Sequence, residues 1–193
     1  MTGTTLAYSG SQVVGSLIES TRRHDGYTAE HSLRTATVAH DIALTIGLAP
    51  GVVEQVRLAA LLHDIGKIGI PRSVLNKDGG LDEAEASLVR LHPILGATIL
   101  STIAELRGLA PLVMHHHEHY DGHGYPNGLS GAEIPIESRI ILVADAFDAI
   151  TTDRHYSAAL TEEAAVTEML MWSGRQFDPM AIDALIAVRR AAL

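Results

Sequence analysis

The stretch HHHEHYDGHGYP, residues 115–126, places five histidines, a glutamate and an aspartate within nine positions. Imidazole is the commonest metal ligand in proteins, so a run of this density favours a metal site. The consecutive His116 and His117 would point about 100° apart on a helix, so both can bind one metal only near a helix end. Gly122 and the loop residues around it supply such an end. The zinc-protease pattern HExxH is excluded, because Asp121 stands where its second histidine is required.

A second unusual pair, His63 and Asp64, ends the most apolar stretch of the chain, LAALLHDIGKIGIP. A lone histidine on an apolar helix is usually a core residue, but a buried aspartate beside it is costly unless it is paired or binds a metal. Lys67 follows about one helical turn later. Asp145 stands in another apolar stretch, RIILVADAF, with no cation close by in the sequence. These residues indicate a site rather than core packing.

His31 and His92 carry weaker signals. Alone, His31 would be a surface or capping residue, and His92, directly before Pro93, would mark a helix end. All these residues have one explanation if several helices direct nitrogen and oxygen ligands into a common interior. Imidazole and carboxylate ligands without sulfur favour iron or manganese, and two ions are the natural number. A nickel- or zinc-storage tract would explain the histidine run but not Asp64 or Asp145.

The elements that must position these residues are predicted to be helices almost throughout. Apolar periodicity and capping signals predict helices around 13–18, 33–46, 52–64, 82–91, 93–105, 109–118, 135–150, from Thr161 to Gly174 and from about 178 onward. Residues 119–134 form the only long irregular stretch, and a structured loop of this length is usually functional. No strand-like alternation persists. The fold class predicted is therefore an all-α bundle.

Composition narrows the class of protein. The 193 residues, 47% hydrophobic, suit one domain, which we place at 11–193 after a flexible N-terminus at 1–10. The chain has no cysteine, which excludes disulfides and thiolate zinc sites. A net charge of −9 argues against a nucleic-acid polymer as partner. The absence of a signal-like start or a long apolar run predicts a cytoplasmic chain without a membrane partner.

The sequence resembles the HD-GYP branch of the HD phosphohydrolase superfamily over roughly residues 10–190. The matching stretches, in the family's order, are EHSLRTATVAHDIALTIGL, AALLHDIGKIGIP, LHPILGATIL, HHEHYDGHGYPNGLSGAEIP, RIILVADAFDAITTDRHY and GRQFDP. HDIGK alone indicates the superfamily, whereas HHExxDGxGYP is the signature of the branch. The resemblance implies an HD-domain helical bundle with a central dinuclear metal site and an irregular GYP loop.

The resemblance also implies an activity, the hydrolysis of cyclic di-GMP to linear pGpG, with onward cleavage to GMP as a further step. By carry-over, one metal is bound by His31, His63, Asp64 and Asp145, and the other by Asp64, His92, His116 and His117, with Asp64 bridging. Asp64 and Lys67 would be catalytic, while Lys67, Tyr125 and Arg154 would bind substrate, Tyr125 by stacking on guanine. A further implied partner is a diguanylate cyclase (GGDEF) domain at the GYP loop. Apart from the resemblance, a homodimer is expected as one route of regulation.

Three positions depart from the family pattern. Tyr27 stands where some relatives have a glutamate that binds a third metal, so a dinuclear centre is expected. Asn127 and Ser157 replace basic residues found in many relatives, which weakens the expected contacts with phosphate. The loss of these contacts keeps a second interpretation open, a cyclic-dinucleotide sensor or adaptor of low activity acting through the GYP loop. A di-iron oxygenase on the same scaffold is disfavoured by the GYP signature and Lys67.

Overall fold

The computed structural model describes residues 3–24, 26–77, 79–153 and 158–191, with side chains from Gln12 onward except at 26 and 27. Its α-helices are α1 (Gly3–His24), α2 (Gly26–Ile46), α3 (Pro50–Leu62), α4 (Arg72–Leu75), α5 (Glu83–Val89), α6 (His92–Ser101), α7 (Ala110–Met114), α8 (Ile136–Thr151), α9 (Glu162–Leu170) and α10 (Pro179–Ala191). Three 3₁₀ turns are η1 (Ile65–Gly69), η2 (Arg107–Leu109) and η3 (Gly131–Glu133). The described residues contain no β-strand, which confirms the predicted all-α class.

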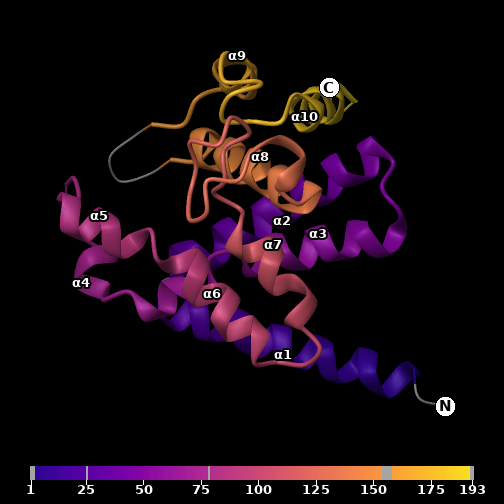
Figure 1. Ribbon diagram of the computed structural model, residues 1–193, viewed down its shortest axis with the longest axis vertical. Coiled ribbons are helices and arrows are strands. Elements are labelled where there is room, and N and C mark those ends of the chain that lie inside the picture. The colour runs from indigo at the N-terminus through magenta and orange to yellow at the C-terminus, as the bar shows by residue number, and fades with distance from the viewer. Residues whose placement is uncertain (1–2, 25, 78, 154–157, 192–193) are drawn as a thin grey trace.

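The centre of the bundle is formed by α2, α3 and α8, which pack against one another. Figure 1 shows these helices in the middle of the molecule, with α9 and α10 beyond α8 on one side and α1 with α6 on the other. Ile42, Val56, Ile140 and Val143 are completely buried between them. Burying one such side chain contributes roughly 1.5–3 kcal/mol to stability. The helices that carry His31 and Asp145, and the helix that ends just before His63, are therefore firmly held.

Local signals set several helix starts as predicted. Asp82 and Glu85 form a complete capping box at α5, with the Asp82 carboxylate accepting from the Glu85 N–H at 2.9 Å and the Glu85 carboxylate accepting from the Asp82 N–H at 2.9 Å. The Thr161 hydroxyl accepts from the Ala164 N–H at the start of α9. Pro135 directly precedes α8.

Helix ends were predicted less well. The helix expected at 109–118 ends at Met114, so His116 and His117 lie in the turn that follows. The helix expected to reach residue 105 ends at Ser101, where Ser101 and Thr102 hydroxyls donate to the carbonyls of Thr98 and Ile99. Similarly, α9 ends at Leu170 before Gly174. The short elements η1 and α4 were not predicted, because each is too short to show a period.

The N-terminal segment is helical from Gly3, so α1 begins within the residues 1–10 that sequence analysis assigned to the N-terminus. The division of the chain into 1–10 and 11–193 stays a prediction. Within the described part of the chain, no helix combines the length and the apolar character that a membrane crossing requires.

Candidate metal centre

The fold brings together all seven residues predicted to bind metal, although they span positions 31 to 145. His31 lies on α2, His63 and Asp64 directly follow α3, His92 begins α6, His116 and His117 follow α7, and Asp145 lies on α8. Two groups have ligand atoms close enough to share an ion: His31, His63 and Asp64, and His92, His116 and His117. The centre is deeply buried, since His63 and Asp64 are 1% and 2% exposed.

Asp64 connects the two groups. One carboxylate oxygen, Oδ2, lies 3.4 Å from the Nε2 atom of His63, while Oδ1 lies 3.3 Å from the Nε2 atom of His92. On the first side, Asp145 Oδ1 lies 3.0 Å from His31 Nε2 and 4.0 Å from His63 Nε2. Asp64 therefore presents one carboxylate oxygen to each set of imidazoles.

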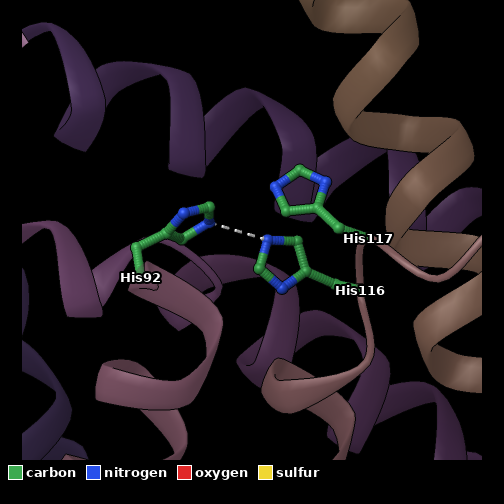
Figure 2. Close-up of side chains that lie close together, drawn as sticks. All are labelled: His92, His116 and His117. Atoms are coloured by element: carbon green, nitrogen blue, oxygen red, sulfur yellow. Dashed lines mark hydrogen bonds between the residues drawn. The ribbon is translucent and has the colours of Figure 1, made fainter. Parts of the chain in front are cut away.

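The second group is a tight cluster of three imidazoles, drawn in Figure 2. The Nε2 atoms of His92 and His116 lie 3.2 Å apart. The ring of His117 lies 4.1 Å from that of His116 and 5.0 Å from that of His92, measured between centroids. His116 and His117 therefore both lie against His92, because they stand in the turn after α7. On a continuous helix, consecutive side chains would point about 100° apart.

Three of the histidines are oriented in the same way. The Nδ1–H groups of His63, His92 and His116 each donate to the carbonyl three residues earlier, at 2.6, 2.8 and 2.6 Å. These acceptors are Ala60, Val89 and Val113, at or near the ends of α3, α5 and α7, where carbonyls lack helical partners. A neutral ring that donates from Nδ1 has its lone pair on Nε2. The Nε2 lone pairs thus point into the centre, as metal ligation requires.

The Nδ1–H tautomers of His92 and His116 indicate that a cation fits between these two rings. In the contact between His92 and His116, both Nε2 atoms carry lone pairs, so neither neutral ring has a proton to donate to the other. A cation between the rings would remove this repulsion. The donor set of imidazole nitrogens and carboxylate oxygens, without sulfur, suits a divalent transition metal such as iron or manganese.

His31 is held by a residue that sequence reasoning missed. The Oδ2 atom of Asp148 lies 2.7 Å from His31 Nδ1, and the same carboxylate accepts from Arg34 at 2.6 and 3.0 Å. Asp148 is 4% exposed. The signal was present in the sequence, because Asp148 follows Asp145, and Arg34 follows His31, by one helical turn on the same faces.

Burial and charge set the protonation of the centre. Burial lowers the pKa of His92 and His116, and lowers that of His117 to about 3, so these rings are neutral ligands at neutral pH. His31 behaves differently: burial alone would lower its pKa, but its bonds to Asp145 and Asp148 raise it to about 9. Burial would raise the pKa of Asp64, yet Lys67 and nearby histidines hold it well below its usual range.

Lys67 lies at the accessible side of Asp64. Its Nζ atom donates to Asp64 Oδ2 at 2.7 Å, and its side chain is 25% exposed while that of Asp64 is 3% exposed. The 3₁₀ turn η1 that places Lys67 packs against α6. Gly66 permits this approach, because a Cβ there would meet the His92 carbonyl oxygen at 2.0 Å. Lys67 therefore stands between the buried centre and solvent.

The GYP loop, residues 119–134, is fixed from inside by Glu118. This side chain is 1% exposed, and its carboxylate accepts from the N–H groups of Asn127 at 2.7 Å and Leu129 at 3.1 Å. The Tyr125 N–H donates to the His117 carbonyl, and the Tyr125 ring stacks on the His117 imidazole at 4.9 Å. The expected irregular stretch is confirmed, except for the short turn η3.

Two sequence predictions cannot be placed. Arg154, predicted to bind substrate, lies outside the described residues, as does the side chain of Tyr27. Tyr125 lies at the rim of the centre, and its stacking on guanine stays a prediction.

Comparisons with known proteins identify the family and the fold. A sequence model described as HD domain matches residues 12–181. The cyclic di-GMP phosphodiesterase response regulator RpfG of Xanthomonas campestris pv. campestris is 41% identical over 180 residues, which are 92% of this chain and 48% of RpfG. The 3'3'-cGAMP-specific phosphodiesterase 2 of Vibrio cholerae is 33% identical over 183 residues, 94% of this chain and 35% of that protein. The chain thus spans less than half the length of these relatives.

Solved structures share the fold. The cyclic GMP-AMP-specific phosphodiesterase V-cGAP3 of V. cholerae superposes with a TM-score of 0.73 at 21% identity, covering 93% of this chain and 48% of that one. The HD domain of the phosphodiesterase PgpH from L. monocytogenes superposes with a TM-score of 0.63 at 18% identity, covering 91% of this chain and 98% of that domain.

Proposed function

Because the chain belongs to the HD domain family, we propose that it is a metal-dependent phosphodiesterase that opens cyclic di-GMP to linear pGpG, with GMP as a further product. The observation that carries this proposal is the position of Asp64, whose two oxygens face separate sets of imidazoles. A bridging carboxylate with ligands on both sides is suited to a pair of ions. The two relatives named above, one a cyclic di-GMP and one a cGAMP phosphodiesterase, support a cyclic dinucleotide as substrate.

The residues of the site would have different roles in the reaction. His31, His63, Asp64 and Asp145 would hold one divalent ion, and Asp64, His92, His116 and His117 the other. A bound pair of iron or manganese ions supplies Lewis acidity toward a phosphodiester and lowers the pKa of a water nucleophile. Lys67, at the exposed side of Asp64, would place its ammonium against the scissile phosphate and donate a proton to the leaving oxygen. Asp148 and the backbone carbonyls keep the imidazoles aimed inward.

We also propose a location and two partners for this chain. The location is the cytoplasm, and the partners are a second copy of the chain and a diguanylate cyclase domain that contacts the GYP loop. The buried anchoring of this loop by Glu118 supports a surface of defined shape there.

The test compares the wild-type protein with the double variant His63→Ala, Asp64→Ala. Both proteins are loaded with Fe(II) or Mn(II) under anaerobic conditions, metal per chain is measured by mass spectrometry, and cyclic di-GMP hydrolysis is followed by chromatography. We expect about two ions and linear product only from the wild type. His40→Ala, which removes a half-exposed histidine paired with Asp41, is the matched control and should retain both metal and activity.

Other outcomes point to other functions. Tight binding of cyclic di-GMP without product under both metals would replace the enzyme with a sensor. Oxygen consumption by the iron-loaded protein, without phosphodiester cleavage, would indicate an oxygenase. Wild-type metal content in the double variant would remove the proposed centre altogether.

A further inference from the structure

We propose that Arg90 binds the second, non-reacting phosphate of the cyclic dinucleotide and so selects two-phosphate substrates. This inference rests on the proposed function and deepens it, because it names a substrate contact that the metal ligands do not provide. Arg90 lies outside the set of residues that sequence analysis assigned to the site.

The backbone around Arg90 is tied to the metal centre. Arg90 is the C-cap of α5, and its N–H donates to the Ala86 carbonyl. The preceding carbonyl, that of Val89, accepts from His92 Nδ1 at 2.8 Å. The bond that aims the His92 ring therefore also fixes the backbone next to Arg90. The Arg90 residue itself is exposed, whereas His92 is 2% exposed.

The side chain of Arg90 lies against the rim of the centre. Its guanidinium carbon is 5.8 Å from the centroid of the Tyr125 ring, within the range of a cation–π contact. The Tyr125 ring in turn stacks on His117, with an angle of 27° between the planes. A continuous series of contacts, His117 to Tyr125 to Arg90, thus runs outward from the His92, His116 and His117 side of the centre.

Two other cationic side chains, Lys67 and Arg34, already contact carboxylates of the centre. The Lys67 ammonium contacts Asp64, and the Arg34 guanidinium contacts Asp148, so both neutralise carboxylates of the centre. Among the residues that the structure describes, the Arg90 guanidinium contacts the Tyr125 ring and forms no ion pair, so its N–H donors are available to an anion. A planar guanidinium that rests on a ring can still bind a phosphate through two parallel hydrogen bonds.

A cation at this position suits the chemistry of the substrate. A cyclic dinucleotide carries two phosphodiesters, and only one can react at the metal centre at a time. The other is an anion brought to a chain of net charge −9, so an exposed cation at the rim offsets the repulsion. Lys67 and Arg90 contact different parts of the centre. Lys67 pairs with Asp64, whereas Arg90 lies against Tyr125, which stacks on His117 of the imidazole cluster.

The experiment compares two substrates in metal-loaded wild type, Arg90→Ala and Arg90→Lys. Cyclic di-GMP has the second phosphate, whereas bis(p-nitrophenyl) phosphate has a single phosphodiester. For Arg90→Ala we expect KM for cyclic di-GMP to rise about tenfold or more, the loss of one charge-assisted contact, with kcat nearly unchanged. The rate on bis(p-nitrophenyl) phosphate and the metal content should stay at wild-type values. Arg90→Lys should recover part of the affinity.

Controls separate the contact from general effects. Arg107→Ala removes an exposed arginine of η2 whose Nε donates to the Ser101 carbonyl, and it changes net charge equally. It should leave both substrates unaffected. Equal losses on both substrates in Arg90→Ala would show a structural role and overturn the inference, as would unchanged KM for cyclic di-GMP. A change in the preference for cyclic di-GMP over cyclic di-AMP would overturn it too, because a guanine contact would then be responsible.

The failure of the proposed function has its own signature. If the wild type cleaves bis(p-nitrophenyl) phosphate but not cyclic di-GMP, the proposed cyclic di-GMP phosphodiesterase activity is wrong. The Arg90 contact is then tested by calorimetry, which measures the affinity of wild type and Arg90→Ala for cyclic di-GMP. A tenfold or larger loss of cyclic di-GMP affinity in Arg90→Ala would then support the contact, at about the size set by a charge-assisted bond. Equal affinity, or no binding by wild type, would overturn it.

Discussion

The Nε2 atoms of His92 and His116 face each other at 3.2 Å while the opposite nitrogen of each ring is committed to a carbonyl. Two lone pairs thus converge in a buried space where neither ring has a spare proton. Such an arrangement is unfavourable in the metal-free protein and is corrected by a cation. The folded chain therefore holds its imidazoles in a geometry suited to a metal, maintained by helix-end carbonyls instead of by the ion.

Asp148 is expected to act through His31. In Asp148→Asn the carboxylate that fixes His31 Nδ1 loses its charge, and the ring loses its preferred orientation. Loss of such an outer partner typically lowers metal affinity about 10-fold to 100-fold. Titration with Mn(II), followed by electron paramagnetic resonance, should show one weakened ion and one bound as in wild type. Asp183→Asn on α10, an exposed aspartate, is the control; equal weakening of both ions would contradict the assignment.

Metal binding should release a proton from His31. Without metal, both ring nitrogens face carboxylates, and the pKa of about 9 keeps the ring charged at pH 7.5. An ion at Nε2 must displace that proton, so apparent affinity should rise by about tenfold per pH unit up to pH 9 and then level off. The pKa values of His92, His116 and His117 are lowered, so these rings are already neutral and release none.

Calorimetry in buffers of different ionisation enthalpy measures this proton directly. At pH 7.5 we expect about one proton per chain on filling of the centre, and about none in His31→Asn. Proton release that persists in the variant would place the titrating group elsewhere.

Gly66→Ala should separate η1 from α6. The new Cβ would lie 2.0 Å from the His92 carbonyl oxygen and 2.5 Å from the Gly96 nitrogen, both backbone atoms that cannot move alone. We expect a loss of about 1–3 kcal/mol in unfolding free energy, as for overpacked cores, together with lost metal at the Asp64 and His92 position. Gly51→Ala on α3 meets nothing within 4 Å and should stabilise by about 0.5–1 kcal/mol. Denaturant unfolding of both variants checks the contrast.

Glu118→Gln should loosen the GYP loop. The buried carboxylate accepts from two backbone N–H groups, and an amide offers only one acceptor atom, so the Asn127 or Leu129 N–H loses its partner. An unsatisfied buried donor costs about 1–3 kcal/mol, enough to open the loop. Limited proteolysis should then cut between residues 119 and 134, with a higher KM for substrate. Glu163→Gln, exposed on α9, should resist cleavage like wild type; an equally resistant Glu118→Gln would remove this role.

The sequence alone determined the fold class and the chemistry of the site. Apolar periodicity with few strand signals predicted helices, and His63 with Asp64 in an apolar stretch indicated a site because a buried carboxylate is costly without a partner. The seven predicted metal ligands do lie together. His63, Asp64 and Asp145 were indicated by their apolar surroundings, whereas the complete set came from the family resemblance. The local signal is strongest where an ionisable side chain stands among apolar neighbours, as at His63, Asp64 and Asp145.

Only the tertiary structure decided the residues that aim and flank these ligands. The predicted helix at 109–118 stops at Met114, and this early end is what turns His116 and His117 toward the same partner. Asp148, Glu118 and Arg90 gained their roles from contacts with His31, the backbone of residues 127–129 and Tyr125. Such contacts join segments far apart in the chain or fixed by a turn, and periodicity reports only which face of one helix is apolar. Chain packing, rather than local preference, determines where the polar ends of separate helices meet.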